Sequence, residues 1–261
     1  MFKIDYNSYR SVASFNQRVR FLVMHYTAQN FVNSVKFLTG KSVSAHYLVP
    51  DPTDTSYQAA GFNGVRIFNL VDENERAWHA GASKWGNCNN LNDTSIGIEI
   101  VNLASGNGEY ITFPYFNPQQ IEAATQLAQN ILQRYPYITP VNVVAHSDIA
   151  LGRKSDPGPQ FPWRQLYHAG VGAWYDEATK QKYQQNYGSH GLPAQQQLLT
   201  LFAKYGYDIS AATGAEGYRQ LVRAFQLHFR QKRYDGVMDV ETAAILRALL
   251  DKYAAEGLYG E

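Results

Sequence analysis

The sequence lacks long hydrophobic runs, paired cysteines and an excess of charge of either sign. No stretch approaches the roughly eighteen apolar residues of a membrane-spanning helix, and residues 1–20 lack the apolar core of a signal peptide, so neither feature is expected. The single cysteine, Cys88, excludes an internal disulfide and leaves the redox compartment open. A formal net charge of +1 gives no electrostatic reason to expect nucleic acid or an anionic membrane as a partner.

The composition that remains is that of a folded protein. Apolar residues make up 45% of the 261 residues and aromatic residues 14%, whereas disordered chains are poor in both. The length exceeds that of a usual single domain, so we expect one main domain and one accessory domain. With a net charge of only +1, any ligand must be recognised by the shape of a site rather than by the overall charge of the protein.

Three apolar, β-branched runs predict strands. They span residues 20–26, 95–101 and 141–146. The first run is apolar on both faces, which indicates a central strand. Between the second and the third, apolar residues repeat at helical spacing behind an Asn117 cap with Pro118 at the first helical position, and a shorter helix is expected over 30–39. Strands that alternate with helices predict an α/β domain with a mixed central sheet flanked by helices.

The C-terminal part of the sequence predicts a linker and then a small helical domain. Residues 179–192 are rich in glutamine, asparagine and glycine, which is typical of a linker between a domain at 1–178 and one at 193–261. Three helical patterns follow the linker, over 193–205, 215–230 and 240–253. The last follows Asp239, a good helix cap. We therefore expect a compact three-helix C-terminal domain.

Each of the three predicted strands carries one polar residue where an apolar one would be expected. His25 lies in the first strand, Glu99 interrupts the second, with Gly97 leaving space beside it, and His146 ends the third. An unpaired buried carboxylate is costly, and a buried imidazole must satisfy its nitrogens. The three groups therefore suggest a shared centre, and a metal ion would satisfy them together.

The loop after His146 adds another carboxylate, Asp156, in a segment stiffened by prolines. Because Pro157 biases Asp156 toward an extended conformation, we expect Lys154 and Asp156 to project to the same side. Two imidazoles and one carboxylate leave a fourth zinc position open for water, which is the pattern of a catalytic site.

The residue pattern alone leaves alternatives open. His46 and His79 compete as metal ligands, and any of the histidines could instead be a satisfied core or surface residue. Glu99 could pair with an arginine, and Lys154 with Asp156 could form a solvated loop pair.

Several motifs resemble a known family. They are HYTA at 25–28, SAHYL at 44–48, AWHAG at 77–81, LNDTSIGIEIVN at 91–102 and VVAHSDIALGRKSDPGPQFPW at 143–163. Together they resemble the zinc-dependent type 2 N-acetylmuramoyl-L-alanine amidases, especially the AmiD and AmpD branch, over roughly residues 15–175. The region after 190, with AFQLHFR at 224–230 and YDGVMDVETAAI at 234–245, is similar to the peptidoglycan-binding tail of AmiD-like members.

The resemblance implies a fold, a reaction and a set of site residues. It implies one catalytic zinc ion with the ligands His25, His146 and Asp156. It places Glu99 as the residue that orients or deprotonates the attacking water, and Lys154 beside the scissile carbonyl. The implied reaction is hydrolysis of the amide between the lactyl group of N-acetylmuramic acid and the first L-alanine of the stem peptide, with peptidoglycan or muropeptides as partners.

A substrate made of glycan and peptide calls for a groove with aromatic surfaces for stacking. The expected substrate-binding residues are His46, Tyr47, Trp78, His79, Trp85 and Asn92. Phe161 is a further stacking candidate, although we expect both Phe161 and Trp163 in the core.

Two other functions are considered. This fold also occurs in non-catalytic peptidoglycan recognition proteins that have lost a zinc ligand, but all three ligand positions are filled here. A zinc peptidase of the stem peptide would keep the metal and change the bond. The substrate favours the periplasm or cell envelope, with the cytoplasm as the alternative location.

Overall fold

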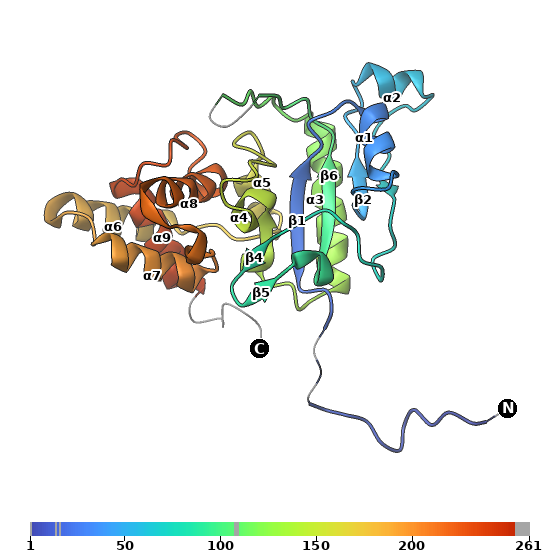
Figure 1. Ribbon diagram of the computed structural model, residues 1–261, viewed down its shortest axis with the longest axis horizontal. Coiled ribbons are helices and arrows are strands. Elements are labelled where there is room, and N and C mark those ends of the chain that lie inside the picture. The colour runs from blue at the N-terminus through green and yellow to red at the C-terminus, as the bar shows by residue number, and fades with distance from the viewer. Residues whose placement is uncertain (1, 14, 16, 107–109, 254–261) are drawn as a thin grey trace.

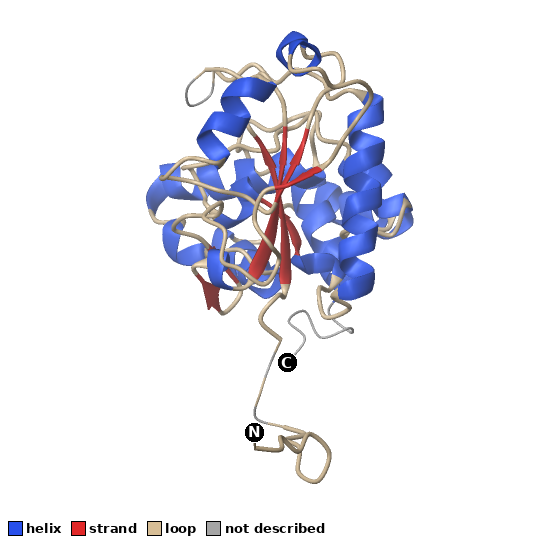
Figure 2. Cartoon of the chain, turned by 90° about the vertical axis from the view of Figure 1, so that its right-hand side faces the viewer, coloured by secondary structure: helices blue, strands red, loops and turns tan. Residues whose placement is uncertain are grey.

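The computed structural model describes residues 2–13, 15, 17–106 and 110–253. Its centre is a mixed sheet with the strand order β3-β2-β6-β1-β7. The strands are β1 (Phe21–Tyr26), β2 (Tyr47–Val49), β3 (Phe68–Asn69), β6 (Ser95–Ile100) and β7 (Val143–Ala145). Figure 2 shows these strands in the middle of the molecule with helices on both sides. The mixed α/β fold expected from the sequence is confirmed, and β1, β6 and β7 are the three predicted strands.

The pairing within the sheet brings the polar residues of these strands to one place. β1 runs parallel to β6 on one side and to β7 on the other. His25 is the register partner of Glu99, so both side chains leave the sheet on the same face. His146 follows directly after β7. The three residues therefore meet where the carboxyl ends of parallel strands come together, which is where open α/β sheets bind ligands.

Helices between residues 31 and 168 cover the sheet. They are α1 (Phe31–Leu38), α2 (Thr55–Ala59), α3 (Pro118–Arg134), α4 (His146–Ile149) and α5 (Trp163–His168). The helix α3 begins as predicted, because the Asn117 side chain accepts a hydrogen bond from the Gln119 N–H at 3.0 Å and Pro118 occupies the first helical position. Its apolar stripe, which includes Ala124 and Ile131, is buried in the main core.

Short elements complete this half of the chain. The strands β4 (Lys84–Trp85) and β5 (Cys88–Asn89) form a hairpin. Two 3-10 turns, η1 (Leu91–Asp93) and η2 (Pro140–Asn142), lead directly into β6 and β7. These turns fix where the two strands that carry site residues begin.

The three predicted C-terminal helices are confirmed, and a further helix occupies the predicted linker. The confirmed helices are α7 (Gln195–Tyr205), α8 (Gly214–Phe229) and α9 (Val240–Tyr253), with the turn η3 (Ile209–Ala211) between α7 and α8. The interpretation of 179–192 as a linker is wrong, because α6 (Glu177–His190) spans most of it and lies against α9. It is capped by Asp176, whose carboxylate accepts the Thr179 N–H at 2.8 Å.

The C-terminal helices share a core with the sheet. One continuous cluster of buried apolar residues contains strand residues such as Val23 together with Phe202, Phe225 and Ile245 from α7, α8 and α9. Figure 1 shows this helical part beside α4 and α5, on the side of the sheet away from α1 and α2. Among the described residues, no helix combines the length and the apolar character that a membrane crossing requires.

Candidate metal centre and active site

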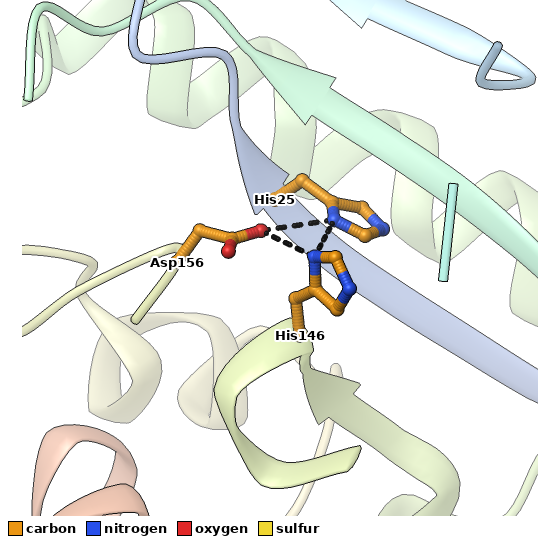
Figure 3. A group of neighbouring side chains, drawn as sticks. All are labelled: His25, His146 and Asp156. Atoms are coloured by element: carbon orange, nitrogen blue, oxygen red, sulfur yellow. Dashed lines mark hydrogen bonds and ion pairs between the residues drawn. The ribbon is translucent and has the colours of Figure 1, made fainter. Parts of the chain in front are cut away.

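Three buried side chains converge on one point at the carboxyl edge of the sheet (Figure 3). The Nδ1 atoms of His25 and His146 lie 3.0 Å apart. Oδ2 of Asp156 lies 3.0 Å from the first and 2.9 Å from the second. Zinc binds nitrogen at about 2.0–2.1 Å, so the ligand atoms of one zinc ion are separated by roughly 3.3 Å. The triangle of two nitrogens and one oxygen has about this size.

The hydrogen bonds around His146 make the triangle suited to a cation. Nε2 of His146 lies 3.0 Å from the carbonyl oxygen of Ala80, which can only accept, so Nε2 carries the proton. In the neutral ring, Nδ1 then presents a lone pair to the carboxylate oxygen of Asp156. Two acceptors that face each other at 2.9 Å repel unless a positive charge lies between them. The donor set therefore fits a divalent metal ion.

A second chain of hydrogen bonds orients His25. Its Nε2 lies 3.0 Å from Nδ1 of His79, and Nε2 of His79 lies 3.2 Å from the hydroxyl of Ser95. The Ser95 hydroxyl donates in turn to the carbonyl oxygen of Leu91. If every donor faces an acceptor, the protons lie on Nε2 of both histidines, which leaves Nδ1 of His25 free for a metal. Hydrogen bonds of this kind fix the tautomer of a metal-binding histidine.

Gly97 makes the position of His79 possible. A Cβ atom at Gly97 would lie 2.5 Å from Cγ of the His79 ring. The missing side chain thus lets the ring pack directly over β6, between His25 and Ser95. The space that the sequence predicted beside Glu99 is filled by an imidazole.

Burial and local charge shift the pKa values of these groups. Burial, together with the neighbouring His146, lowers the pKa of His25 to about 4. Burial alone would raise the pKa of Asp156, but the charge and hydrogen bonds of His146 and His25 outweigh it and hold that pKa below its usual range. Near neutral pH, His25 is thus a neutral imidazole and Asp156 an ionised carboxylate, the forms that bind a metal.

Glu99 lies beside the triangle with a buried oxygen. Its Oε2 has no hydrogen-bond partner within the described part of the chain. Burial, followed by the charge of Asp156, raises the pKa of Glu99 well above its ordinary value, while Lys154 opposes the shift. A carboxylate with a raised pKa is a better proton acceptor. Lys154 and Asp156 line the same cleft, together with Ser155 between them.

The triangle opens into a cleft of about 460 Å³. Its walls come from two halves of the chain. One side carries Trp78, His79 and Lys154. The other side is formed by α8, from residues at helical spacing that include Glu216, Gln220 and Leu227. The cleft is therefore built jointly by the sheet and the C-terminal helices.

Two of the predicted substrate-binding residues line this cleft. Trp78 is 53% exposed there, and His79 is 7% exposed. Tyr47 lies outside the lining and donates its hydroxyl proton to Glu73 at 2.8 Å. Asn92 is buried, and its Oδ1 accepts hydrogen bonds from the backbone N–H groups of His79 and Ala80. Asn92 thus holds the loop that carries His79.

His46 and Trp85 lie in the interior. His46 is fully buried, and both of its ring nitrogens are used, because Nδ1 accepts the Gly97 N–H at 3.0 Å and Nε2 lies 3.2 Å from the Glu75 carbonyl oxygen. Trp85 is 1% exposed and packs edge-on against Tyr205 and Tyr207. The prediction that these two side chains contact substrate is therefore wrong, since neither reaches the cleft.

Two aromatic side chains lie where the sequence predicted them, whereas the α8 side of the cleft was not predicted. Phe161 and Trp163 are buried in the core, as expected. The α8 wall was missed, although its polar residues repeat at helical spacing. Such a stripe on an amphipathic helix is ordinarily a solvated face, so nothing in the sequence singled it out.

Known proteins are similar to this chain in sequence and in fold. The model of the family described as N-acetylmuramoyl-L-alanine amidase matches residues 15–159. The N-acetylmuramoyl-L-alanine amidase AmiD of Escherichia coli (strain K12) is 46% identical over 243 residues, which cover 92% of this chain and 85% of that protein.

Two solved structures are similar over nearly the whole chain. AmpDH3 from Pseudomonas aeruginosa has 59% sequence identity and a TM-score of 0.94, covering 97% of this chain and 100% of the other. AmiD from Escherichia coli, in a complex with the substrate anhydro-N-acetylmuramic acid-L-Ala-D-gamma-Glu-L-Lys, has 43% identity and a TM-score of 0.83, covering 96% and 97%. Because the family model matches more than half of the chain and AmiD is similar over 92% of it, the chain belongs to the N-acetylmuramoyl-L-alanine amidase family.

Proposed function

We propose that this protein is a zinc-dependent amidase that cleaves the amide between the lactyl group of N-acetylmuramic acid and the L-alanine of the stem peptide. The observation that carries the proposal is the buried triangle of His25, His146 and Asp156, whose ligand atoms lie 2.9–3.0 Å apart and of which His146 and Asp156 line the cleft. Membership of the amidase family and the muropeptide bound to the AmiD relative support the choice of substrate.

The three residues of the triangle would hold one zinc ion through two nitrogens and one oxygen. Two imidazoles and one carboxylate are a ligand set of catalytic zinc sites. When bound, zinc supplies a Lewis acid that lowers the pKa of water from 15.7 to about 7. Around it, the protein contributes oriented ligands: the Ala80 carbonyl oxygen fixes His146, and His79 fixes His25.

Glu99 and Lys154 would handle the proton and the developing charge. Glu99 lines the cleft with a raised pKa and a buried oxygen that has no partner among the described residues, so it accepts a proton from the attacking water and passes it to the departing alanine amine. A well-placed general base and acid contributes roughly 10²–10⁴-fold to the rate. Lys154, whose charge acts on both His25 and Glu99, would stabilise the negative charge that forms on the carbonyl oxygen.

The test is a muropeptide digest analysed by mass spectrometry, with and without a chelator. We expect a free L-alanine amino terminus as the new end, loss of the product after chelation, and recovery with added zinc. An internal cut within the stem peptide would assign a peptidase instead. Binding without any product would assign a recognition protein.

We place the enzyme in the cell envelope, because its proposed substrate is part of the wall polymer. Residues 193–261 would add a second contact with that polymer and so raise the effective concentration of enzyme at the wall. The α8 wall of the cleft supports this arrangement, since it puts the helical region next to any bound substrate. Fractionation of cells tests the location in the cell envelope, and sacculus pull-down tests the contact between residues 193–261 and the wall polymer.

A further inference from the structure

A buried carboxylate joins the C-terminal helices to the metal centre. Asp148 lies on α4, two residues after His146, and is 0% exposed. Its Oδ2 accepts the backbone N–H of Ala145 at 2.8 Å and lies 2.7 Å from Nδ1 of His228. Its Oδ1 accepts the hydroxyl proton of Tyr207 at 2.7 Å. One carboxylate therefore binds the end of β7, the helix α8 and the segment after α7.

Asp148 controls the local conformation around His146. The helix α4 is only four residues long, and His146 is its first residue. A single turn of helix is unstable alone, because fixing its backbone costs more than its few hydrogen bonds return. The bond from the Ala145 N–H to Asp148 closes this turn at its start. The direction in which His146 leaves the backbone thus depends on the position of the Asp148 carboxylate.

The position of that carboxylate depends in turn on the C-terminal helices. A buried charge needs partners, and two of the three groups that contact Asp148 are His228 and Tyr207. The ring of His228 is itself held by Trp163 and Phe229, with ring centroids 3.8 and 3.9 Å away. Burial and the Asp148 charge raise the pKa of Tyr207 well above its usual value, so its hydroxyl stays protonated and donates.

We propose that the C-terminal helices complete the metal centre, with Tyr207 and His228 acting as positioning residues that hold the ligand His146 through Asp148. Neither residue contributes an atom to the triangle of His25, His146 and Asp156. Their effect passes through the closed turn of α4. The inference rests on the proposed metal centre but not on which bond the enzyme cleaves.

The experiment measures metal binding in the full-length protein. Tyr207→Phe removes one oxygen atom, and His228→Phe keeps an aromatic ring for the stack but removes the donor to Asp148. His228→Asn places an amide N–H near the position of Nδ1 and serves as the rescue. Tyr253→Phe is the matched control, because its buried hydroxyl bonds the backbone N–H and carbonyl oxygen of Trp174 rather than Asp148.

The readouts are the zinc dissociation constant, from competition with a chromophoric chelator, and the visible spectrum of the cobalt-substituted protein. Loss of a group that orients a metal ligand weakens metal binding by about 10–100-fold. We expect a weakening of this order, with an altered cobalt spectrum, in Tyr207→Phe and His228→Phe. We expect wild-type values in Tyr253→Phe and nearly wild-type values in His228→Asn. Thermal melts confirm that each variant is folded.

The outcomes separate this inference from the proposed function. Unchanged zinc affinity and an unchanged cobalt spectrum in folded Tyr207→Phe and His228→Phe would overturn it, and if His228→Phe does not fold, Tyr207→Phe decides alone. An equal loss of affinity in Tyr253→Phe would also overturn it, because the effect would then be general destabilisation. Weakened zinc binding in Tyr207→Phe and His228→Phe, together with a wild type that binds zinc but forms no L-alanine product, would support the inference and refute the amidase activity. A wild type that binds no metal would refute both.

Discussion

Replacing Gly97 by alanine should damage the metal centre without touching a ligand. A Cβ atom at this position would lie 2.5 Å from Cγ and 2.6 Å from Nδ1 of His79. Carbon atoms in contact prefer about 3.5–4.0 Å, so the imidazole must retreat by roughly 1 Å. It is held in place by His25 at 3.0 Å and by Ser95 at 3.2 Å.

The size of the effect follows from this displacement. A retreat of about 1 Å would stretch the contact between His79 and His25 to roughly 4 Å, which is no longer a hydrogen bond. His25 then loses the acceptor that fixes its tautomer, and we expect zinc to bind about 10–100-fold more weakly. Overpacking of this kind costs about 1–3 kcal/mol of stability, which lowers Tm by about 2–12 °C in a chain of this size.

The assay compares zinc affinity, amidase rate and Tm for Gly97→Ala and two further changes. Gly188→Ala is the matched control, because that helical glycine has no atom within 4 Å of its would-be Cβ, and the change should stabilise the protein by about 0.5–1 kcal/mol. In a His79→Ala background the clash is gone, so adding Gly97→Ala should cost little more. Wild-type zinc affinity in Gly97→Ala, or full additivity of the two substitutions, would refute the reasoning.

Three further predictions concern the base, the aromatic residues and acid stability. Glu99→Gln should lower turnover by about 10²–10⁴-fold while zinc content, measured by atomic absorption, stays at the wild-type level; an active variant would remove Glu99 from the reaction. Trp78→Ala should raise KM for muropeptides with Tm nearly unchanged, whereas Trp85→Ala, at a core position, should cost about 3–5 kcal/mol of stability; equal melting curves would contradict the assignment of the two tryptophans. Burial lowers the pKa of His25 from 6.5 to about 4 and lowers that of His79 as well. As pH falls, these histidines therefore take up protons in the unfolded chain at a higher pH than in the folded protein, which favours unfolding. The Tm of the metal-free protein should therefore be steady above about pH 7 and fall between pH 6.5 and 4, and a flat profile would show that these histidines are accessible to protons in the fold.

The elements that the sequence predicted are those with a strong local pattern. The strands β1, β6 and β7 are β-branched runs, and α3 has both an Asn117 cap and an apolar stripe. The helix α6 has no such stripe, because it packs through side chains such as Lys180 and Tyr183 that form ion pairs and hydrogen bonds with α9. Polar residues used in this way look like a linker in the sequence. The short strands β2 and β3 carry too few residues for a period to be recognised.

The site was predictable only in part for a related reason. The pattern of residues placed His25, Glu99 and His146 on core strands, but it could not choose between His46, His79 and Asp156 as the remaining ligand. The choice depends on which nitrogen atoms are already used, and that is a property of the fold. Both ring nitrogens of His46 form hydrogen bonds with backbone groups, and those of His79 form hydrogen bonds with His25 and Ser95. The residue pattern offered Asp156 as a candidate, and the resemblance to the amidase family selected it over the two histidines.

The buried bond between Asp148 and the C-terminal helices also changes how the role of those helices can be tested. Deleting 190–261 would remove Tyr207 and His228, and with them Phe202 and Phe225 from the shared core. A truncated protein that no longer binds sacculi and no longer cleaves them would then say nothing about wall binding, because the metal centre would have lost its support. Retention at the wall has to be measured with substitutions of exposed residues that leave zinc affinity unchanged. Only a variant that keeps zinc and activity on soluble muropeptides, yet fails to bind sacculi, would show that the helical region contacts the polymer as well as supporting His146.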